Sequence, residues 1–565
     1  MVNSTALSES SAKIRQQNLA AVSASAVAIF ICLFGNLGAI GLIGPDESRY
    51  AWIARAMSES GDWVTPRLYG QPWFEKPILY YWAAAAGFRL NLSPEWAARL
   101  PSACAALAAT IGISWLAWKF FDPRKDFIRG PALIAPLLFS TTVAAIGFSR
   151  AATPDMLFCS SIALAMACAA AVLNGRGFLT CASPSNGPAS QTDLRPLLLW
   201  GAFLGAGVLA KGPAALILAG GAIALWAMST HRWRAAIRLA HPLAIGAFCI
   251  VALPWYVVCS IRNPQFLRIF ILQHNFERYL TPVFMHRQPV WFFIPIFLLA
   301  LLPWTVFLWP AARAGLEMWR QKSWEESPGF FFACWTVFPI LFFSFSESKL
   351  PSYILPAVPP AALFLGVTWF RLQRGESSAS RIFSRLTATL GLTWMAPATG
   401  ALVWLHRLPS PMRTELRGPL QTLAILAFLG GASIILLGLR ARRFVFLTSV
   451  FVAVACVIVV NQSLLPALDP YLSARRHAEF LRDNLYPGHI FTYQLPRSWN
   501  FGLAFYFHRE LPEWSPQDPD AVLLLTTPQG FEKIKQQGRF GGTLEESYRG
   551  ILFVPVLPAP RSGTR

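Results

Sequence analysis

Apolar runs of about 20 residues recur along almost the whole chain, and they constrain its fold more than any other feature. A helix needs about 20 predominantly apolar residues to cross a bilayer, where every backbone polar group must be bonded internally. The 565 residues are 55% hydrophobic and only 13% charged, whereas a soluble domain carries about a quarter charged residues. The sequence therefore predicts an α-helical polytopic membrane protein.

About thirteen transmembrane helices are expected within residues 20–463. The stretch 196–229 is the least regular of them, because Lys211-Gly212-Pro213 divides it into two short pieces. The expected spans are 20–43, 96–116, 131–148, 155–173, 196–210, 213–229, 241–260, 290–310, 328–345, 353–370, 386–405, 419–438 and 444–463.

The distribution of Lys and Arg predicts the orientation. If the N-terminal tail, residues 1–19, lies inside, the cations concentrate in inner loops, as the positive-inside rule requires; Arg413 and Arg417 are exceptions. The net charge of +20 therefore indicates membrane loops rather than nucleic-acid binding. An odd number of spans places the C-terminus outside. The basic inner loops are 119–129, 232–238, 313–322, 371–385 and 440–443.

Two long loops and the C-terminal segment are expected on the outer side. The loop 44–95 predicts a helix from Asp46 and an amphipathic aromatic stretch near the membrane interface; the second long loop is 261–289. Residues 464–565 predict a small α/β domain. Its expected elements are a helix capped by Ser473, strands 489–493, 522–526 and 551–556, and a helix over 528–537.

The segment Gly44-Pro45-Asp46-Glu47 places two carboxylates directly after the first apolar run. Asp46 suits a helix N-cap, and acids in a first turn suit the helix dipole, so both residues could be purely structural. Alternatively, a carboxylate fixed at the membrane surface acts as a base or as an orienting group.

Further charges beside apolar spans fall on the same outer side. Asp155 begins a span, Lys211 interrupts one, and Glu75-Lys76 precede a proline. Asp155 could be an N-cap, Lys211 could snorkel, and the Glu75-Lys76 pair could be solvated. The lysines also suit lipid phosphate, which a compact ammonium group binds well.

Two more polar segments add to this set. His274 and Arg278 are spaced to share one face of a helix, and Lys349 and Tyr353 lie in a serine-rich turn between two apolar spans. A phosphate could lie between His274 and Arg278. His274 could instead hold a divalent cation with Glu75, although two ligands are a weak signal for zinc. The nine cysteines include no CxxC motif, which argues against a disulfide framework or a thiolate metal site.

Cations and carboxylates gathered on one face suit a particular chemistry. Cations stabilise a departing lipid phosphate, on which negative charge grows in the transition state. A carboxylate can position or deprotonate the acceptor. This is the logic of sugar transfer from a polyprenyl-phosphate sugar.

Several ordered motifs resemble the bacterial aminoarabinose (lipid A) transferases and, more broadly, the protein mannosyltransferase-like GT-C glycosyltransferases. The resemblance covers about residues 20–370 and is more specific for the superfamily than for the sugar. The motifs are Pro45-Asp46-Glu47-Ser48-Arg49-Tyr50, Gly61-Asp62-Trp63-Val64-Thr65-Pro66, Phe74-Glu75-Lys76-Pro77, Arg150-Ala151-Ala152-Thr153-Pro154-Asp155, Leu209-Ala210-Lys211-Gly212-Pro213 and Ser348-Lys349-Leu350-Pro351-Ser352-Tyr353.

The resemblance implies a GT-C fold and an inverting transferase that uses an undecaprenyl-phosphate sugar. It also implies a monomer in the bacterial inner membrane, with its site and C-terminal domain on the periplasmic side. Asp46 and Asp155 would be the two acids, with Glu47 beside the first. Lys76, Arg278, Lys349, Tyr353 and Lys211 would contact the donor phosphate, and Glu75 and His274 match positions that can hold a metal such as zinc.

Other functions remain open at this stage. A protein O-mannosyltransferase-like or oligosaccharide ligase activity would use the same donor chemistry on another acceptor. A lipid or glycan transporter would predict paired repeats and ionisable residues deep within the spans, and neither is evident. The acceptor is expected to be lipid A or another surface glycan or lipid.

Overall fold

The computed structural model describes ten stretches of the chain, which form two compact units. Unit 1 comprises Met1–Gly35, Phe74–Tyr80 and Leu100–Val459, and unit 2 comprises Asn36–Trp73, Tyr81–Arg99 and Val460–Arg565. The described residues are 2–122, 130–174, 193–277, 288–325, 327–374, 377–483, 490–515, 522–536, 547–548 and 551–556.

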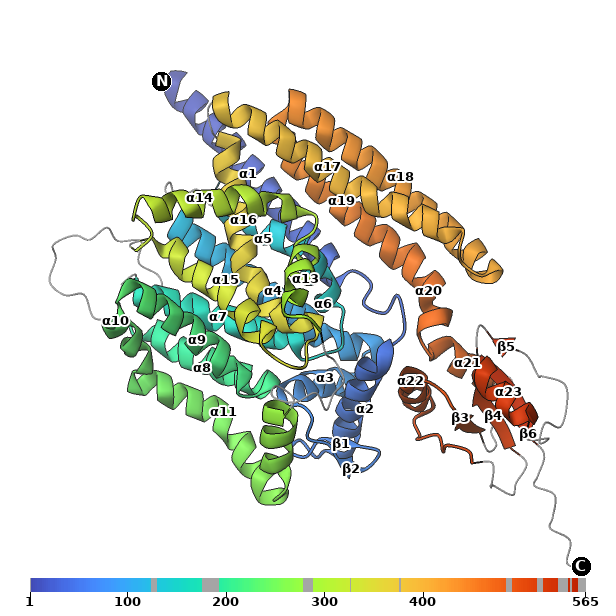
Figure 1. The fold of residues 1–565 in the computed structure, drawn as a ribbon. Helices are drawn as coiled ribbons and strands as arrows, with labels where there is room; N and C mark the ends of the chain where they lie inside the picture. Colours follow the sequence, from blue (N-terminus) through green and yellow to red (C-terminus); the bar gives the residue numbers. More distant parts are fainter. Residues whose placement is uncertain are drawn as a thin grey trace, which may run out of the picture. The chain divides into compact units, whose positions relative to one another are not determined.

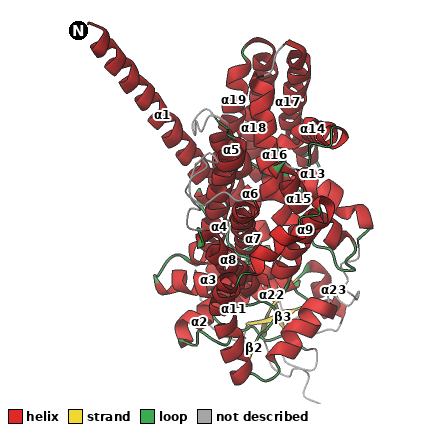
Figure 2. Cartoon of the chain, turned by 90° about the vertical axis from the view of Figure 1, so that its left-hand side faces the viewer, coloured by secondary structure: helices red, strands yellow, loops and turns green. Residues whose placement is uncertain are grey.

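Unit 1 is built from helices, which are drawn in red in Figure 2. Helices α3 (Leu79–Arg89) and α4 (Pro94–Leu116) belong in part to each unit. The other helices of unit 1, labelled in Figure 1, are α1 (Val2–Phe34), α5 (Pro131–Ser140), α6 (Val143–Ser149), α7 (Asp155–Leu173), α8 (Arg195–Lys211), α9 (Ala214–Thr230), α10 (Trp233–Ile237), α11 (Pro242–Arg262), α13 (Phe293–Ala300), α14 (Leu308–Arg320), α15 (Pro328–Ser344), α16 (Val358–Arg374), α17 (Ser377–Leu405), α18 (Ser410–Arg440) and α19 (Val445–Val459).

The expectation of a helical polytopic membrane fold is confirmed. Among the described residues, eight helices are long and apolar enough to span a membrane, or ten if each of two bent pairs is one span. The expected number of about thirteen stays a prediction. Helix α7 is the most buried of the eight, because 89% of its most apolar 18-residue segment is covered by the rest of the protein.

Three of the expected spans differ from the structure. The first helix ends at Phe34 instead of continuing to residue 43, and Asn36 follows with a positive φ of 47°. The span 131–148 is bent by 61° between α5 and α6, where the Thr142 hydroxyl caps α6 by accepting from Ala145 N. The span 290–310 is bent by 107°, at a break that contains Pro303, a residue without an N–H to continue a helix.

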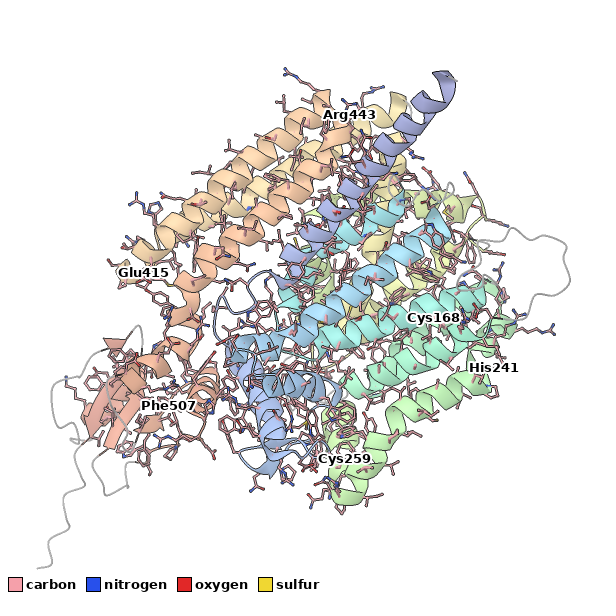
Figure 3. The ribbon with its side chains drawn as sticks, turned by 180° about the vertical axis from the view of Figure 1, so that it is seen from behind. Cys168, His241, Cys259, Glu415, Arg443 and Phe507 are labelled. Carbon is pink, nitrogen blue, oxygen red and sulfur yellow. The ribbon has the colours of Figure 1, made fainter. Side chains whose placement is uncertain are left out.

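Helices α17 and α18 form a hairpin (Figure 1), with arginines near both of its ends. Figure 3 shows Glu415 near the turn of this hairpin and Arg443 just beyond the end of α18. Figure 3 also shows Cys168 and Cys259, which are buried free thiols of α7 and α11.

Unit 2 combines a helical part with a four-stranded sheet. Its helices are α2 (Gly44–Ser60), α20 (Leu465–Leu472), α21 (Arg475–Asp483), α22 (Arg497–Phe507) and α23 (Pro528–Gln536). The short strands β1 (Arg67–Leu68) and β2 (Gln71–Pro72) pair as a hairpin. Its two-residue turn, Tyr69-Gly70, has φ of 50° and 80°, and a glycine accommodates such a value without steric cost.

The sheet confirms the three expected strands and adds a fourth. Its order is β3-β4-β6-β5, with β3 and β4 parallel and the remaining pairs antiparallel. Tyr493, Trp514, Leu524 and Val554 form part of its buried core. Ser473 Oγ accepts from Arg475 N at 3.0 Å, as expected of a cap for α21. The strands are β3 (Ile490–Tyr493), β4 (Val522–Thr526), β5 (Ser547–Tyr548) and β6 (Ile551–Val556).

Candidate functional site

In unit 1, Asp155 and Lys211 form an ion pair where α7 begins and α8 ends. Lys211 Nζ donates to Asp155 Oδ1, and both side chains are only 15% exposed. Helix α8 stops here because Gly212 adopts a positive φ of 84° and Pro213 follows. The two charges that separate the apolar runs in the sequence are therefore each other's partners.

The Lys211 ammonium also lies over two aromatic rings. Its Nζ is 5.0 Å from the centre of the Tyr353 ring and 5.5 Å from that of Phe158. Tyr353 belongs to the 3-10 helix η7 (Pro351–Ala357), and its ring packs on Phe343 at 4.8 Å. The structure thus brings together three of the predicted site residues, Asp155, Lys211 and Tyr353.

Glu75 and Lys76 form a second, adjoining ion pair. Lys76 Nζ lies 3.4 Å from Glu75 Oε1, with side-chain exposures of 15% and 11%. Lys76 also interacts electrostatically with the Asp155 carboxylate. The interpretation of this pair as solvated side chains is therefore wrong, because the fold holds both in a largely buried setting.

Lys349 adds a further buried cation. Its side chain donates to Ser346 O at 2.5 Å, and the residue is only 6% exposed. Ser346 Oγ in turn donates to Ser348 O at 3.0 Å. These bonds fold residues 346–349 into a compact turn immediately before η7, which carries Tyr353.

Two predicted residues are not placed. His274 lies in the π-helix η3 (Arg268–Glu277), but its side chain is outside the described set, as is the whole of Arg278. The predicted pairing of Glu75 with His274 around a metal therefore stays a prediction. Within the described residues, no three His, Cys, Asp or Glu side chains gather in a metal-binding arrangement.

Asp46 and Glu47 lie in unit 2, in the first turn of α2. The N-cap interpretation of Asp46 is wrong, because Ile43 occupies that position and Pro45 lies in the first turn. It is Glu47 that reaches back, accepting a hydrogen bond from Ile43 N at 2.9 Å. Asp46 instead accepts from Arg49 Nη2 at 2.6 Å, and its side chain is 55% exposed.

Glu47 is part of a buried polar network that the sequence did not predict. Arg99 Nη2 donates to Glu47 Oε2 at 2.7 Å and to Gly41 O, and Arg99 Nη1 donates to the carbonyl oxygens of Leu37 and Ile40. The only sequence signal was an arginine within the expected span 96–116. Such a residue, costly in lipid, needs partners within the fold.

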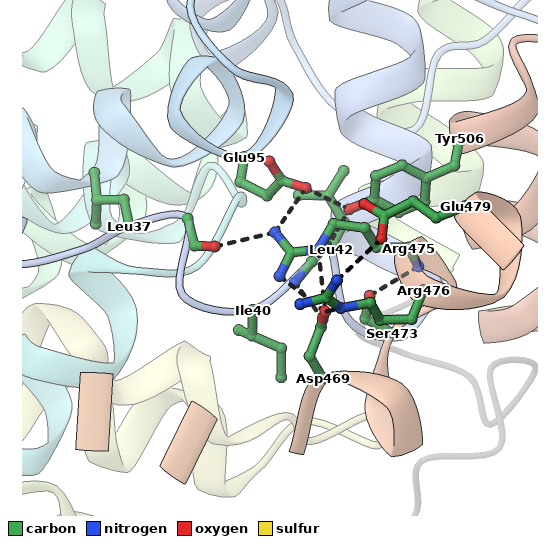
Figure 4. A network of polar contacts seen from close by, with 12 residues as sticks. Leu37, Ile40, Leu42, Glu95, Asp469, Ser473, Arg475, Arg476, Glu479 and Tyr506 are labelled. Carbon is green, nitrogen blue, oxygen red and sulfur yellow. Dashed lines mark hydrogen bonds and ion pairs between the residues drawn. The ribbon is translucent and has the colours of Figure 1, made fainter. Parts of the chain in front are cut away.

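A second part of this network joins the C-terminal segment of unit 2 to the same loop (Figure 4). Asp469 accepts from Gly41 N at 2.7 Å and from Arg475 Nη2 at 2.8 Å. The Tyr506 hydroxyl donates to Glu95 at 2.7 Å and accepts from Leu42 N at 2.9 Å. Burial and the Glu95 carboxylate raise the pKa of Tyr506 well above its usual range.

The chain is similar to known glycosyltransferases in sequence. The family model described as dolichyl-phosphate-mannose-protein mannosyltransferase matches residues 19–270. The undecaprenyl phosphate-alpha-4-amino-4-deoxy-L-arabinose arabinosyl transferase of Edwardsiella ictaluri is 31% identical over 352 residues, which are 62% of this chain and 60% of that protein. Its namesake in Pseudomonas aeruginosa strain UCBPP-PA14 is 31% identical over 369 residues, 65% and 62% of the two chains.

The matched region spans about three fifths of the length of these relatives. The fold resembles the crystal structure of ArnT from Cupriavidus metallidurans bound to undecaprenyl phosphate, with a TM-score of 0.75 and 22% identity over 95% of this chain and 97% of that one. The apo form of the same protein gives a TM-score of 0.71. In sequence, over about three fifths of its length, and in fold, over nearly all of it, this chain is therefore similar to the aminoarabinose transferases.

Proposed function

We propose that this protein transfers a sugar from an undecaprenyl-phosphate-linked donor to lipid A or another lipid or glycan acceptor outside the cytoplasm. The observation that carries this proposal is the buried charged cluster of unit 1. It comprises two linked ion pairs, Glu75–Lys76 and Asp155–Lys211, to which we add Lys349, in the turn before the 3-10 helix η7. Three cations and two carboxylates give a formal net charge of +1, which suits a phosphate group.

The reaction has a simple electron balance. The bond between the anomeric carbon of the sugar and the donor phosphate oxygen breaks, and its electron pair stays on the phosphate. An acceptor oxygen forms the new bond to that carbon from the opposite face. Lysines in a water-poor site stabilise the charge that develops on the leaving phosphate. Lys76, Lys211 and Lys349 are proposed for this role, with Arg278 as a fourth cation.

Tyr353 would line the phosphate site beside Lys211, whose ammonium already lies over its ring. Asp46 and Asp155 are proposed as the acids of the reaction. If the acceptor is a hydroxyl group, an acid takes its proton. If the acceptor is a phosphate, it is already anionic, and the acid only orients it.

An apolar cavity of about 340 Å³ in unit 1 would accept part of the isoprenoid chain. It is lined by residues of α6, α13, η7 and α16, including Val143, Phe148, Leu299, Pro351 and Val358. Pro351 follows Lys349 by two positions. A donor could therefore bind its phosphate to the lysine and its chain in the adjoining cavity. Apolar lining with few polar groups is typical of ligand sites.

The proposed orientation follows from the same helices. Helix α8 begins at Arg195 and ends at Lys211, and α16 begins beyond η7 and ends at Arg374. The charged cluster therefore lies at helix ends opposite to those that carry the exposed arginines. By the positive-inside rule, the cluster would face the periplasm of an inner-membrane protein, as would the proposed C-terminal domain, residues 464–565.

Mass spectrometry of lipid A and surface glycans tests the proposal. Cells with the protein should show a sugar increment on one acceptor, and cells without it, or with a folded Asp46→Asn variant, should not. An increment on exported protein instead would favour the mannosyltransferase-like alternative, which the family model also suggests. Identical spectra from cells with and without the protein would refute the transferase proposal.

A further inference from the structure

Helix α22 of unit 2 packs along α2 toward the turn that carries Asp46. Phe505 lies at one end of this contact. The centre of its ring is 3.6 Å from the guanidinium carbon of Arg55, and its carbonyl oxygen accepts a hydrogen bond from Arg55 Nη1 at 2.8 Å. One turn earlier, Gly502 lies near Ser48 of α2, since a Cβ there would be at an ordinary contact distance of 3.7 Å from Ser48 Oγ, and its close approach is to Ala474, whose Cβ would be 2.8 Å away. Phe501, which directly precedes Gly502, lies beside Arg49.

The Arg49 guanidinium is enclosed by aromatic rings. Its central carbon lies 5.3 Å from the ring centre of Tyr50, 5.4 Å from Trp73 and 5.7 Å from Phe501. The Arg49 side chain is only 7% exposed, whereas its partner Asp46 is 55% exposed. The cation is therefore held within the fold, while the carboxylate extends into solvent.

This asymmetry decides which residue orients the other. An ion pair that is open to solvent contributes little by itself, because water screens the attraction and two flexible side chains must be ordered. Cation–π contacts strengthen when the cation is desolvated, as Arg49 is here. The rings thus fix Arg49 in advance, and its planar fork then sets the direction of the Asp46 carboxylate.

We propose that Arg49 is a positioning residue for Asp46 and that the C-terminal part of the chain, through Phe501, holds Arg49 in place. The inference rests on the proposed function, in which Asp46 acts on the acceptor. It assigns a role to α22, an element that lies more than 400 positions beyond Asp46 in the sequence.

Kinetics of matched arginine variants test the proposal. Arg49→Gln should lower kcat for sugar transfer by about 10- to 100-fold, since small displacements of a catalytic group have effects of this size. The KM for the acceptor and the affinity for undecaprenyl phosphate should not change. Arg49→Lys should retain a higher kcat than Arg49→Gln, because the positive charge remains. Arg497→Gln is the control, because Arg497 is exposed and also lies over Phe501, at 5.7 Å.

A double variant separates positioning from direct substrate binding. In an Asp46→Asn background, in which transfer is lost, Arg49→Gln should leave the affinities for the acceptor and for undecaprenyl phosphate unchanged. A loss of either affinity there would overturn the proposal, since Arg49 would then bind the substrate itself. Wild-type kcat in Arg49→Gln would overturn it as well. Full activity of Asp46→Asn alone would instead refute the proposed role of Asp46, and the positioning role with it.

Amide hydrogen exchange provides a readout that needs no activity. In the purified full-length protein, Phe501→Leu removes the ring but keeps an apolar side chain. Exchange of the amides of residues 46–50 should become faster in this variant and stay unchanged in Arg497→Gln. Unchanged exchange in Phe501→Leu would contradict the role of α22, whatever the outcome of the transfer assay.

Discussion

The Arg99 guanidinium lies 2.7 Å from the Glu47 carboxylate, and the two side chains are only 3% and 7% exposed. This pair joins the beginning of α4 to the first turn of α2, within unit 2. Arg99 also donates to three carbonyl oxygens of residues 37–41. One buried arginine therefore binds both the loop that leads into the Asp46 turn and the turn itself.

Arg99→Met should destabilise unit 2 by about 3–5 kcal/mol, because it leaves a buried carboxylate without its charged partner. The thermal unfolding midpoint of the purified protein measures this loss. Arg89→Met is the control, since Arg89 is exposed and makes only a 3.4 Å hydrogen bond to Ser58 O. Equal midpoints for Arg99→Met and the wild type would contradict the assigned importance of the pair.

Tyr506→Phe should change how stability depends on pH. The folded-state pKa of Tyr506 is raised above the value of about 10 expected in the unfolded chain. The stabilisation that the neutral Tyr506 hydroxyl gives to the folded protein is therefore complete below about pH 10 and is lost as the pH rises further. The variant should lack this alkaline loss of stability.

At neutral pH the same variant should be less stable by about 1–3 kcal/mol, because Leu42 N loses its acceptor and Glu95 loses a donor. Unfolding midpoints between pH 7 and about pH 11 measure both effects. A variant with the alkaline slope of the wild type would show that Tyr506 is not the group responsible.

Asp155→Asn and Lys211→Met should show strong coupling, because the two side chains form a largely buried ion pair. Each single variant leaves one charge without its partner, while the double variant removes both charges. The double variant should therefore be more stable than the sum of the single losses predicts, by about 0.5–3 kcal/mol. Additive losses in the thermal midpoint would argue against the pair.

Lys349→Met should weaken binding of undecaprenyl phosphate by about 10- to 100-fold, the loss expected for a hydrogen bond to a charged group. Lys349→Arg should retain more of the affinity, because the positive charge remains. The matched control is Lys533→Met, an exposed lysine of α23 in unit 2. Titration with undecaprenyl phosphate in detergent measures the affinity, and equal affinities in all variants would place the phosphate site elsewhere.

Local patterns predicted much of this fold. The strands at 490–493, 522–526 and 551–556 and the capped helix α21 follow from alternation and end signals in the sequence. The breaks at 141–142 and 301–303 were not predicted, although Thr141, Thr142 and Pro303 stand there, because transmembrane helices also tolerate such residues without ending. Helix α22 was missed because its many aromatic residues and its glycine lower helix propensity, which packing against α2 overrides.

The candidate site was predicted residue by residue but not as a set of contacts. Asp155, Lys211 and Tyr353 were each identified, yet their mutual pairing depends on where α7, α8 and η7 meet. The partners of Glu47 could not be predicted. Arg99 follows Glu47 by 52 positions, and the network continues to Asp469 and Arg475, which lie more than 420 positions beyond Glu47.

One measurement tests the central claim most directly. The purified protein in liposomes is given an undecaprenyl-phosphate-linked aminopentose and lipid A, and mass spectrometry follows both lipids. We expect release of undecaprenyl phosphate together with an equal gain of sugar on the acceptor, and neither product with Asp46→Asn. A donor that binds yet stays intact with lipid A, with other surface glycans and with exported protein acceptors would contradict the account.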